Sequence, residues 1–243
     1  MNEIIKVENL KKSYGNAVIV NDLNISIRKG EVYGLLGANG AGKSTTIECI
    51  LGTRKADNGK ISILGLNPID NRKKLFQHIS VQFQEATYQE KIFVSELCEE
   101  TSCLYKRPKD YILLLKQFGL FEKLKSPVSE LSGGQKQKLF IILALIPNPQ
   151  VVFLDELTTG LDTMARRDIW TALLELKKEG LTIFLTSHFM DEVEALCDRI
   201  MILKNGVTIF EGTVKEAITH SPCNNFEDTY IWYAEEENNH ENI

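Results

Sequence analysis

The 243-residue sequence predicts an α/β protein with a mixed, mostly parallel sheet and a helical subdomain inserted at about residues 88–145. Two observations support this fold class. Short apolar runs typical of buried strands alternate along the chain with segments of helical periodicity, an order that produces parallel strands covered on both faces. From about residue 90 to 145 the strands stop, and three helical segments follow one another, broken at Pro108 and Pro127.

The first strands and the first helix are predicted from their side-chain periods. Residues 21–30 alternate apolar and polar side chains and end at a glycine, as in a half-buried strand. Residues 31–37 form a continuous apolar run, as in a strand covered on both faces. A helix follows from residue 43 and ends at Gly52. Further strands are expected at 59–65 and 78–85.

The second half of the chain repeats this alternation. A buried strand at 151–156 precedes a helix that Asp162 should cap and Gly180 should end. Another buried strand at 181–188 precedes a helix at 190–200. Two strands then meet at Asn205-Gly206, a dipeptide typical of tight hairpin turns.

Composition and charge limit the classes of function. A net charge of -5 and a pI of about 5.5 argue against a general nucleic-acid-binding surface. Residues 216–243 are acidic, which leaves the body of the chain mildly basic at about +2. The five cysteines show no CxxC pair, so we expect reduced thiols. The first residues do not resemble a signal peptide, and no apolar run approaches the roughly 18 residues of a membrane span.

The segment GANGAGKST at 37–45 matches the phosphate-binding pattern GxxxxGK[ST], between a predicted strand and a predicted helix. Its glycines allow backbone N–H groups to surround a phosphate, and the helix N-terminus adds a favourable partial charge. We expect Lys43 to reach the β- and γ-phosphates and Ser44 to bind Mg²⁺. The nucleotide-binding residues expected here are Gly37, Asn39, Gly40, Ala41, Gly42, Lys43, Ser44 and Thr45.

Two later strands end in side chains suited to phosphoryl transfer. The strand at 151–156 ends in Asp155 and Glu156, and the strand at 181–188 ends in His188. Ligands of such sheets bind beyond the carboxyl ends of the strands, so we expect all three near the phosphates. Asp155 would hold Mg²⁺, and Glu156 would act as general base or position the attacking water. His188 would donate a hydrogen bond to the γ-phosphate.

A second segment suited to an anion is ELSGGQKQK at 130–138. Ser132 should cap a helix, and Gly133 and Gly134 would leave its first backbone N–H groups open. The segment lies on the helical insertion, away from the phosphate loop of the same chain. If two copies pair head to tail, each segment can close on the γ-phosphate held by the other copy. The alternative is an ordinary capped helix whose glycines only allow a tight turn.

Taken in order, these segments resemble the nucleotide-binding subunit of ATP-binding cassette transporters over about residues 3–215. GANGAGKST is similar to its Walker A motif, LSGGQ to its signature motif, VVFLDE to Walker B, TTGLD to the D-loop, and His188 to its switch histidine. The resemblance implies a P-loop NTPase core of the RecA type with an N-terminal antiparallel β region. It also implies an ATP-sandwich dimer, and Tyr14 matches the aromatic residue that stacks on adenine. The signature residues that would complete the site of the other subunit are Ser132, Gly133, Gly134 and Gln135.

The sequence departs from the family pattern at two places. Leu157 stands where the family usually has a proline after the Walker B glutamate, which we expect to loosen the turn into the D-loop without removing a ligand. The Mg²⁺-sensing glutamine usually follows a proline, whereas this chain offers Gln82 and Gln84 in VQFQE. Strand alternation places both on one side of the strand. Spacing to the helical insertion favours Gln84.

The resemblance also implies partners. As a member of this family, the chain would pair with a second, identical ATPase subunit and would bind a separate membrane permease at the cytoplasmic face of the membrane. A groove that receives a short permease helix should be lined by residues from about 84 to 105. Candidate contacts there are Tyr88, Ile92 and Phe93. The alternative, with equal weight, is that these side chains are buried in the core.

Within the family, the chain is most similar to ATPase subunits of bacterial ABC-2-type exporters, which move drugs, antimicrobial peptides or polysaccharides outward. The acidic segment 216–243 would contain a short terminal helix, with Phe226, Tyr230 and Ala234 on one face. Other classes were weighed: a soluble ATPase of the same fold such as a cluster-assembly subunit, a DNA-repair or translation ATPase, and a P-loop kinase. The single cassette argues against a DNA-repair or translation ATPase, and LSGGQ argues against a P-loop kinase.

Overall fold

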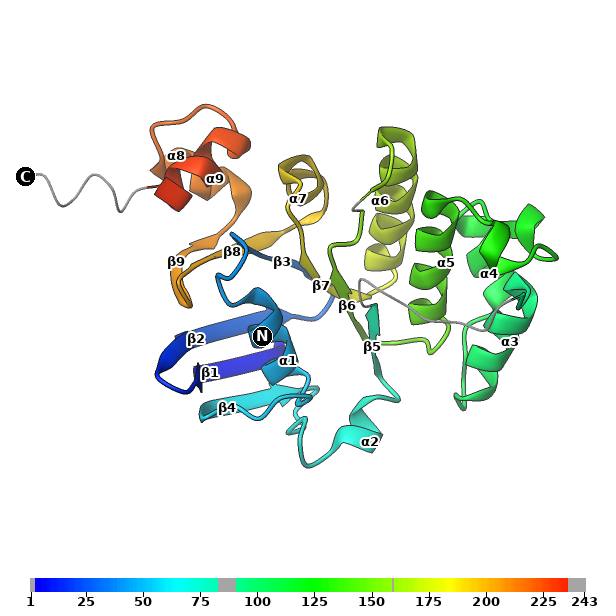
Figure 1. The fold of residues 1–243 in the computed structure, drawn as a ribbon, viewed down its shortest axis with the longest axis horizontal. Helices are drawn as coiled ribbons and strands as arrows, with labels where there is room; N and C mark the ends of the chain where they lie inside the picture. The colour runs from blue at the N-terminus through cyan, green and yellow to red at the C-terminus, as the bar shows by residue number, and fades with distance from the viewer. Residues whose placement is uncertain (1–2, 83–90, 159, 236–243) are drawn as a thin grey trace, which may run out of the picture. The chain divides into compact units, whose positions relative to one another are not determined.

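The computed structural model describes residues 3–82, 91–158 and 160–235, and Figure 1 shows their elements. The chain divides into two compact units. The first unit joins both ends of the chain, Met1–Leu75 and Thr186–Ile243, and the second is Phe76–Leu185. The acidic C-terminal segment belongs to the first unit.

An antiparallel sheet forms one part of the first unit. Its order is β2 (Ala17–Arg28), β1 (Glu3–Tyr14) and β4 (Asn58–Ile63). Ile5 of β1 lies opposite both Ile27 and Ile63, and all three side chains are fully buried. The expected antiparallel β region is confirmed, with one apolar face directed to the core.

The other strands of the first unit are β3 (Val32–Gly37), which leads into the expected phosphate loop, and two strands that pair beside it. β3, buried at every residue, pairs in parallel with β8 (Arg199–Lys204). β8 pairs antiparallel with β9 (Val207–Gly212). Asn205 and Gly206, which join them, have φ angles of 49° and 77°. Both central residues have positive φ, as the expected tight hairpin requires.

Helices complete the core of the first unit. They are α1 (Lys43–Ile50), α2 (Arg72–Leu75), α7 (Met190–Leu196), α8 (Val214–His220) and α9 (Phe226–Glu235). Ala217 of α8 and Phe226 and Tyr233 of α9 belong to the same buried cluster as Leu36 of β3 and Ile202 of β8. The acidic C-terminal segment thus contributes apolar side chains to the core beside the phosphate-loop strand.

The second unit combines parallel strands with the helical insertion. β5 (Ile79–Gln82) pairs in parallel with β6 (Val151–Asp155), and β7 (Thr182–Thr186) follows β6 in the order of the sheet. The helices of this unit are α3 (Val94–Cys103), α4 (Tyr111–Gln117), α5 (Gly133–Leu145) and α6 (Thr163–Lys178), with short 3₁₀ turns at Phe121–Lys123 and Val128–Glu130. The mostly parallel sheet and the inserted helices are confirmed.

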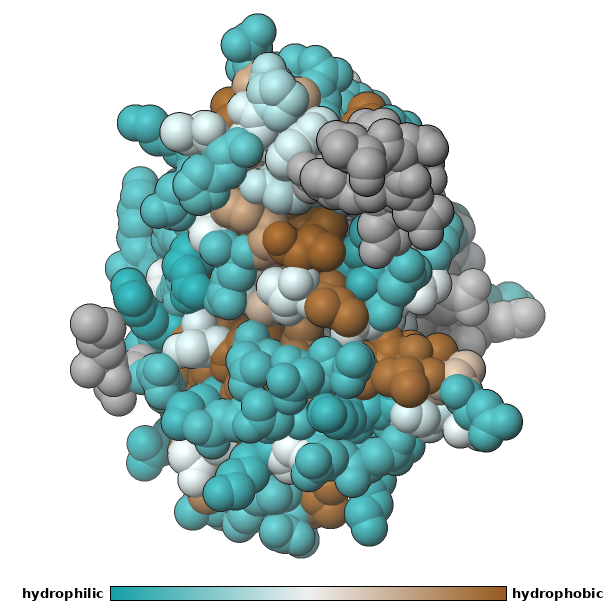
Figure 2. Space-filling view, turned by 90° about the vertical axis from the view of Figure 1, so that its left-hand side faces the viewer, coloured by the Kyte–Doolittle hydropathy of each residue, from teal (hydrophilic) through white to brown (hydrophobic). Residues whose placement is uncertain are grey.

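The surface is largely hydrophilic where Figure 2 shows it, with smaller hydrophobic patches between the polar residues. Within residues 3–82, 91–158 and 160–235, no helix combines the length and the apolar character needed to cross a membrane.

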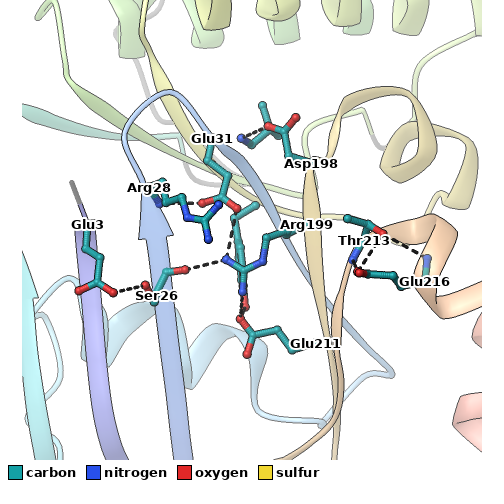
Figure 3. A network of polar contacts seen from close by, with 11 residues as sticks. Glu3, Ser26, Arg28, Glu31, Asp198, Arg199, Glu211, Thr213 and Glu216 are labelled. Carbon is teal, nitrogen blue, oxygen red and sulfur yellow. Dashed lines mark hydrogen bonds and ion pairs between the residues drawn. The ribbon is translucent and has the colours of Figure 1, made fainter. Parts of the chain in front are cut away.

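A polar network around Arg199 joins the strands of the first unit (Figure 3). The Arg199 guanidinium donates to the Ser26 carbonyl at 3.0 Å, to Glu31 at 3.3 Å and to Glu211. It also lies over the Tyr33 ring, 5.5 Å from the centroid. The network thereby connects β2, β3, β8 and β9 through one side chain.

Glu31 is the most buried carboxylate of this network, with 6% of the residue exposed. Its second oxygen accepts a hydrogen bond from the Arg28 backbone N–H at 2.6 Å. The Tyr33 hydroxyl donates to Glu211 at 3.0 Å, and burial together with that carboxylate raises the Tyr33 pKa well above its ordinary value. The buried carboxylate of Glu31 therefore has donors that compensate for lost hydration.

We expect Arg199→Met to destabilise the protein because it leaves Glu31 buried without its cationic partner. The loss should be about 2 kcal/mol in the free energy of unfolding, measured by urea titration followed by circular dichroism. Lys29→Met removes an exposed cation nearby in the sequence and serves as the control, with a change within about 0.5 kcal/mol. Equal stability of the two variants would contradict the role of the network.

Cysteine reactivity offers a second check on the fold. Cys98 of α3 is fully buried, and burial raises the pKa of its thiol to about 12. Burial also raises the pKa of Cys49, whereas Cys103 is exposed. At pH 8 a thiol of pKa 12 is ionised in only about one molecule in ten thousand.

We therefore expect iodoacetamide at pH 8 to alkylate Cys103 of the native protein while Cys98 and Cys49 stay unmodified until denaturant is added, because only the thiolate reacts. Peptide mass spectrometry over a time course measures this. Alkylation of native Cys98 at the rate of Cys103 would show that α3 is packed differently from the structure.

Candidate nucleotide-binding site

The phosphate loop lies between the end of β3 and the start of α1 in the first unit. The Lys43 ammonium, with 8% of the residue exposed, donates to the carbonyls of Gly37 at 2.7 Å and Ala38 at 3.2 Å. Gly37 is buried, whereas residues 38–40 are exposed. The buried lysine is therefore held under a loop whose outer residues face solvent.

Backbone geometry explains two glycines of the loop. Gly40 and Gly42 have φ angles of 82° and 105°, which favour glycine. A Cβ at Gly42 would also lie 2.7 Å from the Ile19 carbonyl oxygen. An alanine at Gly42 would therefore be strained in its backbone and would collide with β2.

The start of α1 suits an anion. Gly42 occupies its N-cap, no side chain caps the helix, and its first turn contains no acidic residue. Ser44 is exposed and Thr45 half-buried. Open N–H groups at a helix N-terminus, with a lysine beside them, are the chemistry that binds a phosphate chain. The residues present fit the triphosphate of a nucleotide.

Tyr14, the residue expected to stack on the base, ends β1 in the same unit. Its side chain is 42% exposed, so a flat ligand has access to the ring. Lys12 Nζ lies 5.5 Å and Arg54 Cζ 5.1 Å from the ring centroid. Neither cation was expected from the sequence, where only a Tyr beside a turn is visible.

A cavity of about 230 Å³ has the loop residues 37–41 in one wall. Leu203, Lys204 and Asn205 of the hairpin form another wall, and Tyr230 and Ala234 of α9 face the same space. Two of the three side chains expected on one face of the terminal helix thus share a cavity with the phosphate loop. The third, Phe226, is fully buried in the core.

The acids of the second unit stand where the sequence predicts, at the end of β6. Asp155 is its last residue and Glu156 follows, both half-buried. Glu156 has a φ angle of 49°, a left-handed conformation that costs a side-chain-bearing residue about 1–2 kcal/mol. Strained backbone of this kind concentrates at functional positions.

Leu157 is fully buried, and its carbonyl accepts a hydrogen bond of 2.6 Å from the Gln137 side chain of α5. The turn that was expected to be loosened by the missing proline is therefore anchored by α5. Gln137 was not singled out in the sequence, because a glutamine two residues beyond LSGGQ carries no local signal for a contact 20 residues away.

The signature segment caps α5 as expected. The Ser132 hydroxyl accepts from the Gln135 N–H at 3.3 Å, and the Gln135 side chain accepts from the Ser132 N–H at 3.1 Å. This reciprocal cap satisfies the ends of the turn. Gly133 and Gly134 lie between the two capping residues, and Gly133 is exposed. A Cβ at Gly133 would have no neighbouring atom within 4 Å.

His188 belongs to the first unit and follows β7, with an exposed side chain. The preceding Ser187 is buried, and its hydroxyl accepts a hydrogen bond from the Phe189 N–H at 3.0 Å. This local turn fixes the backbone on both sides of the histidine. The two units each carry part of the expected site: the loop, Tyr14 and His188 in one, and Asp155, Glu156 and the signature segment in the other.

The expected Mg²⁺ ligands are Ser44, Asp155 and Gln84. Hydroxyl and carboxylate oxygens are the donors that Mg²⁺ prefers, and it commonly keeps waters and substrate phosphates as its other ligands. Gln84 lies outside the described residues, whereas Gln82 is buried in β5. In the part of the chain that the structure describes, no cluster of three or more His, Cys, Asp or Glu forms an all-protein metal site.

The residues expected to contact a permease have different exposures. Tyr88 lies outside the described residues. Ile92 is 8% exposed and Phe93 is 39% exposed. Of this set, Ile92 is therefore a core residue, and Phe93, at the start of α3, is accessible.

A groove of about 320 Å³ lies within the second unit, along β5 and α5. Its walls are mostly apolar and include Phe76, Tyr105, Phe140, Leu143 and Pro147. Tyr105 follows α3, so the helical insertion and the strand–helix core both contribute to this groove. An apolar groove of this kind accepts the side chains of an amphipathic helix.

Comparison with known proteins gives the family. The model of the ABC transporter family matches residues 20–159. The chain is 42% identical over 217 residues to the Nod factor export ATP-binding protein I of Rhizobium sp. (strain N33), across 86% of this chain and 70% of that protein.

Two solved structures are similar. One is the ATP-binding subunit of an ABC transporter, with a TM-score of 0.86 and 27% identity, across 96% of this chain and all of that one. The other is an ATP-binding cassette in a dimeric, post-hydrolysis state bound to ADP and Pi, with a TM-score of 0.77 and 25% identity, across 86% of this chain and 98% of that one. The fold is that of a P-loop NTPase, and the chain belongs to the ABC transporter family as an ATP-binding domain.

Proposed function

We propose that this chain is the ATP-hydrolysing motor of an ABC exporter. It binds ATP with Mg²⁺, pairs head to tail with a second copy, and drives a separate membrane permease from the cytoplasmic face of the membrane. The observation that carries the proposal is the phosphate loop, with Lys43 buried beneath it and an uncapped helix N-terminus free of acids behind it.

Each side chain of the site has a defined task in hydrolysis. Lys43 and the N–H groups of the loop bind the β- and γ-phosphates. Glu156 accepts the proton of the attacking water as its oxygen bonds to the γ-phosphorus. The bond from that phosphorus to the bridging oxygen breaks, and its electron pair stays on the β-phosphate of ADP. His188 donates to the departing γ-phosphate. Ser44 and Asp155 would hold Mg²⁺, which would stabilise the negative charge that develops on the phosphates.

The cap of α5 supports pairing of two copies. The side chains of Ser132 and Gln135 are used in capping each other, so the exposed backbone at Gly133 is left to contact an anion. A helix N-terminus attracts negative charge, and the γ-phosphate of a partner's nucleotide supplies it. The dimeric state of the similar cassette bound to ADP and Pi supports this arrangement.

The export role is supported by the export function of the relatives and by the groove of the second unit. The relatives are ATP-binding proteins of Nod factor export. The groove along β5 and α5 suits a short amphipathic helix from a permease, because Phe76, Tyr105 and Leu143 offer apolar contacts. Docking there would hold the chain at the membrane as a peripheral subunit.

We expect Glu156→Gln to lower the rate of ATP hydrolysis by about 10²–10⁴-fold, because a general base is lost while the site keeps its shape. ATP should still bind, so the variant should accumulate as a dimer with ATP and Mg²⁺. Phosphate release and gel filtration with light scattering measure the two effects.

Lys43→Ala is the matched control for this experiment, because it removes phosphate binding and should give neither hydrolysis nor an ATP-dependent dimer. A Glu156→Gln variant that stays monomeric at high concentration with ATP and Mg²⁺ would count against the sandwich. Full hydrolysis by that variant would remove Glu156 from the catalytic role.

The docking groove is tested by affinity purification from detergent-solubilised membranes of the native cell. Tagged Glu156→Gln protein should recover a multi-span membrane protein in stoichiometric amount. Adding Leu143→Gln should lower the recovery about tenfold, since a polar side chain in the groove removes about 1.4 kcal/mol of apolar contact.

Leu113→Gln is the control for the groove, because Leu113 is 62% exposed on α4 and does not line it. This control should leave recovery unchanged, and both variants should keep their melting temperatures. Recovery only of soluble partners would favour a cluster-assembly type of role and overturn the export proposal, while the ATPase assignment would stand.

A further inference from the structure

Two cations hold the ring of Tyr14, and both are themselves held by carboxylates. Lys12 pairs with Asp57 at 2.7 Å, and the second oxygen of Asp57 accepts the Ser13 N–H at 2.7 Å. The Lys12 ion pair and the Ser13 N–H together keep the Asp57 pKa below its ordinary value. Arg54 pairs with Glu48 at 2.5 Å, and that carboxylate raises the Arg54 pKa.

The backbone places Arg54 as firmly as its side chain does. Glu48 belongs to α1, and its carbonyl accepts the N–H groups of both Thr53 and Arg54 at 3.1 Å. The turn after α1 is thus hydrogen-bonded to the helix, and it places the Arg54 guanidinium beside Tyr14 at the end of β1. Asp57 is fixed in the same way, because its N–H donates to the Lys11 carbonyl at 2.9 Å.

These contacts connect the base platform to the phosphate loop. α1 begins at Lys43, beside the loop, and carries Glu48 in its second turn. A helical rise of about 1.5 Å per residue puts some 7–8 Å between the two residues along the axis. The ring of Tyr14 is therefore positioned from the same helix that positions the phosphates.

From this geometry we infer that Arg54, anchored by Glu48 and assisted by Lys12, is a positioning residue for the nucleotide base. It holds the Tyr14 ring in the orientation that accepts the base, and it ties that orientation to the helix of the phosphate loop. The inference rests on the proposed function, since it assumes that Tyr14 stacks on the base of ATP.

The chemistry favours arginine at this position. A planar guanidinium stacks on an aromatic face and still donates from its edge to a carboxylate, whereas an ammonium is a point charge without a plane. The centroid distance of 5.1 Å lies within the range of a cation–π contact. Because 42% of Tyr14 is exposed, the ring would otherwise be free to rotate into solvent.

The test compares ATP with inorganic tripolyphosphate, which carries the phosphates without a base. Arg54→Met should weaken ATP binding about two- to fivefold by calorimetry, the range of an exposed cation–π contact. Lys55→Met removes the neighbouring exposed cation and controls for net charge. Relative to that control, Arg54→Met should leave tripolyphosphate binding unchanged, and Arg54→Lys should recover only part of the ATP affinity, because an ammonium has no plane to stack on the ring.

A double variant tests whether Arg54 acts through Tyr14. In a Tyr14→Leu background, Arg54→Met should cause no further loss of ATP affinity, since there is no ring to position. Three results would each overturn the inference: unchanged ATP affinity in Arg54→Met, equal weakening of ATP and tripolyphosphate relative to Lys55→Met, or a full Arg54 effect without Tyr14. If the protein without substitutions bound neither ATP nor tripolyphosphate, the proposed function itself would be refuted.

Discussion

The close approach of three backbone segments at Ile19, Gly42 and Gly206 is the constraint on which the first unit depends. A Cβ at Gly42 would lie 2.7 Å from the Ile19 carbonyl oxygen, and one at Gly206 only 2.2 Å from it. The Gly206 N–H also donates to the Ala41 carbonyl at 3.0 Å. Because real Cβ atoms do not approach this closely, only glycines allow β2, the phosphate loop and the β8–β9 hairpin to meet. The proposed phosphate loop is thus held by backbone contacts on two sides.

α1 connects this loop to Tyr14, the residue proposed to stack on the base. Its first residue, Lys43, closes the loop from below, and its Glu48 holds Arg54 over the ring of Tyr14. β1 supplies Tyr14 from the antiparallel sheet. The phosphate loop and Tyr14 are therefore both positioned by contacts with α1. This shared support would keep the proposed phosphate and base contacts at a fixed distance from each other.

Local chemistry made much of this predictable from the sequence. The phosphate loop, the Asn205-Gly206 hairpin and the Ser132 cap depend on residues within a few positions of each other, so their patterns are visible in the chain. The contact of Arg54 with Tyr14 joins residues 40 positions apart, and that of Arg199 with Glu31 joins residues 168 positions apart. No periodicity or spacing encodes such pairs.

The same limit applies to the terminal helices. The acidic charge of residues 216–243 carries no signal for burial, yet Phe226 and Tyr233 belong to the same buried cluster as Leu36 of β3. The acidic residues lie on the outer face of these helices. The apolar residues between them pack into the core and so determine the position of the helices. Gln84 and Tyr88, by contrast, lie outside the described residues, so the choice between Gln82 and Gln84 still rests on sequence spacing.

In the second unit, α5 carries the signature segment at its N-terminus and also contacts the turn that follows β6. α5 offers the exposed backbone of Gly133 at its N-terminus, and one turn later its Gln137 holds the Leu157 carbonyl at 2.6 Å. Leu157 directly follows Glu156, whose φ of 49° is strained and needs support from its surroundings. The signature segment and the residue that follows the proposed base are therefore joined within the second unit by one helix and one hydrogen bond.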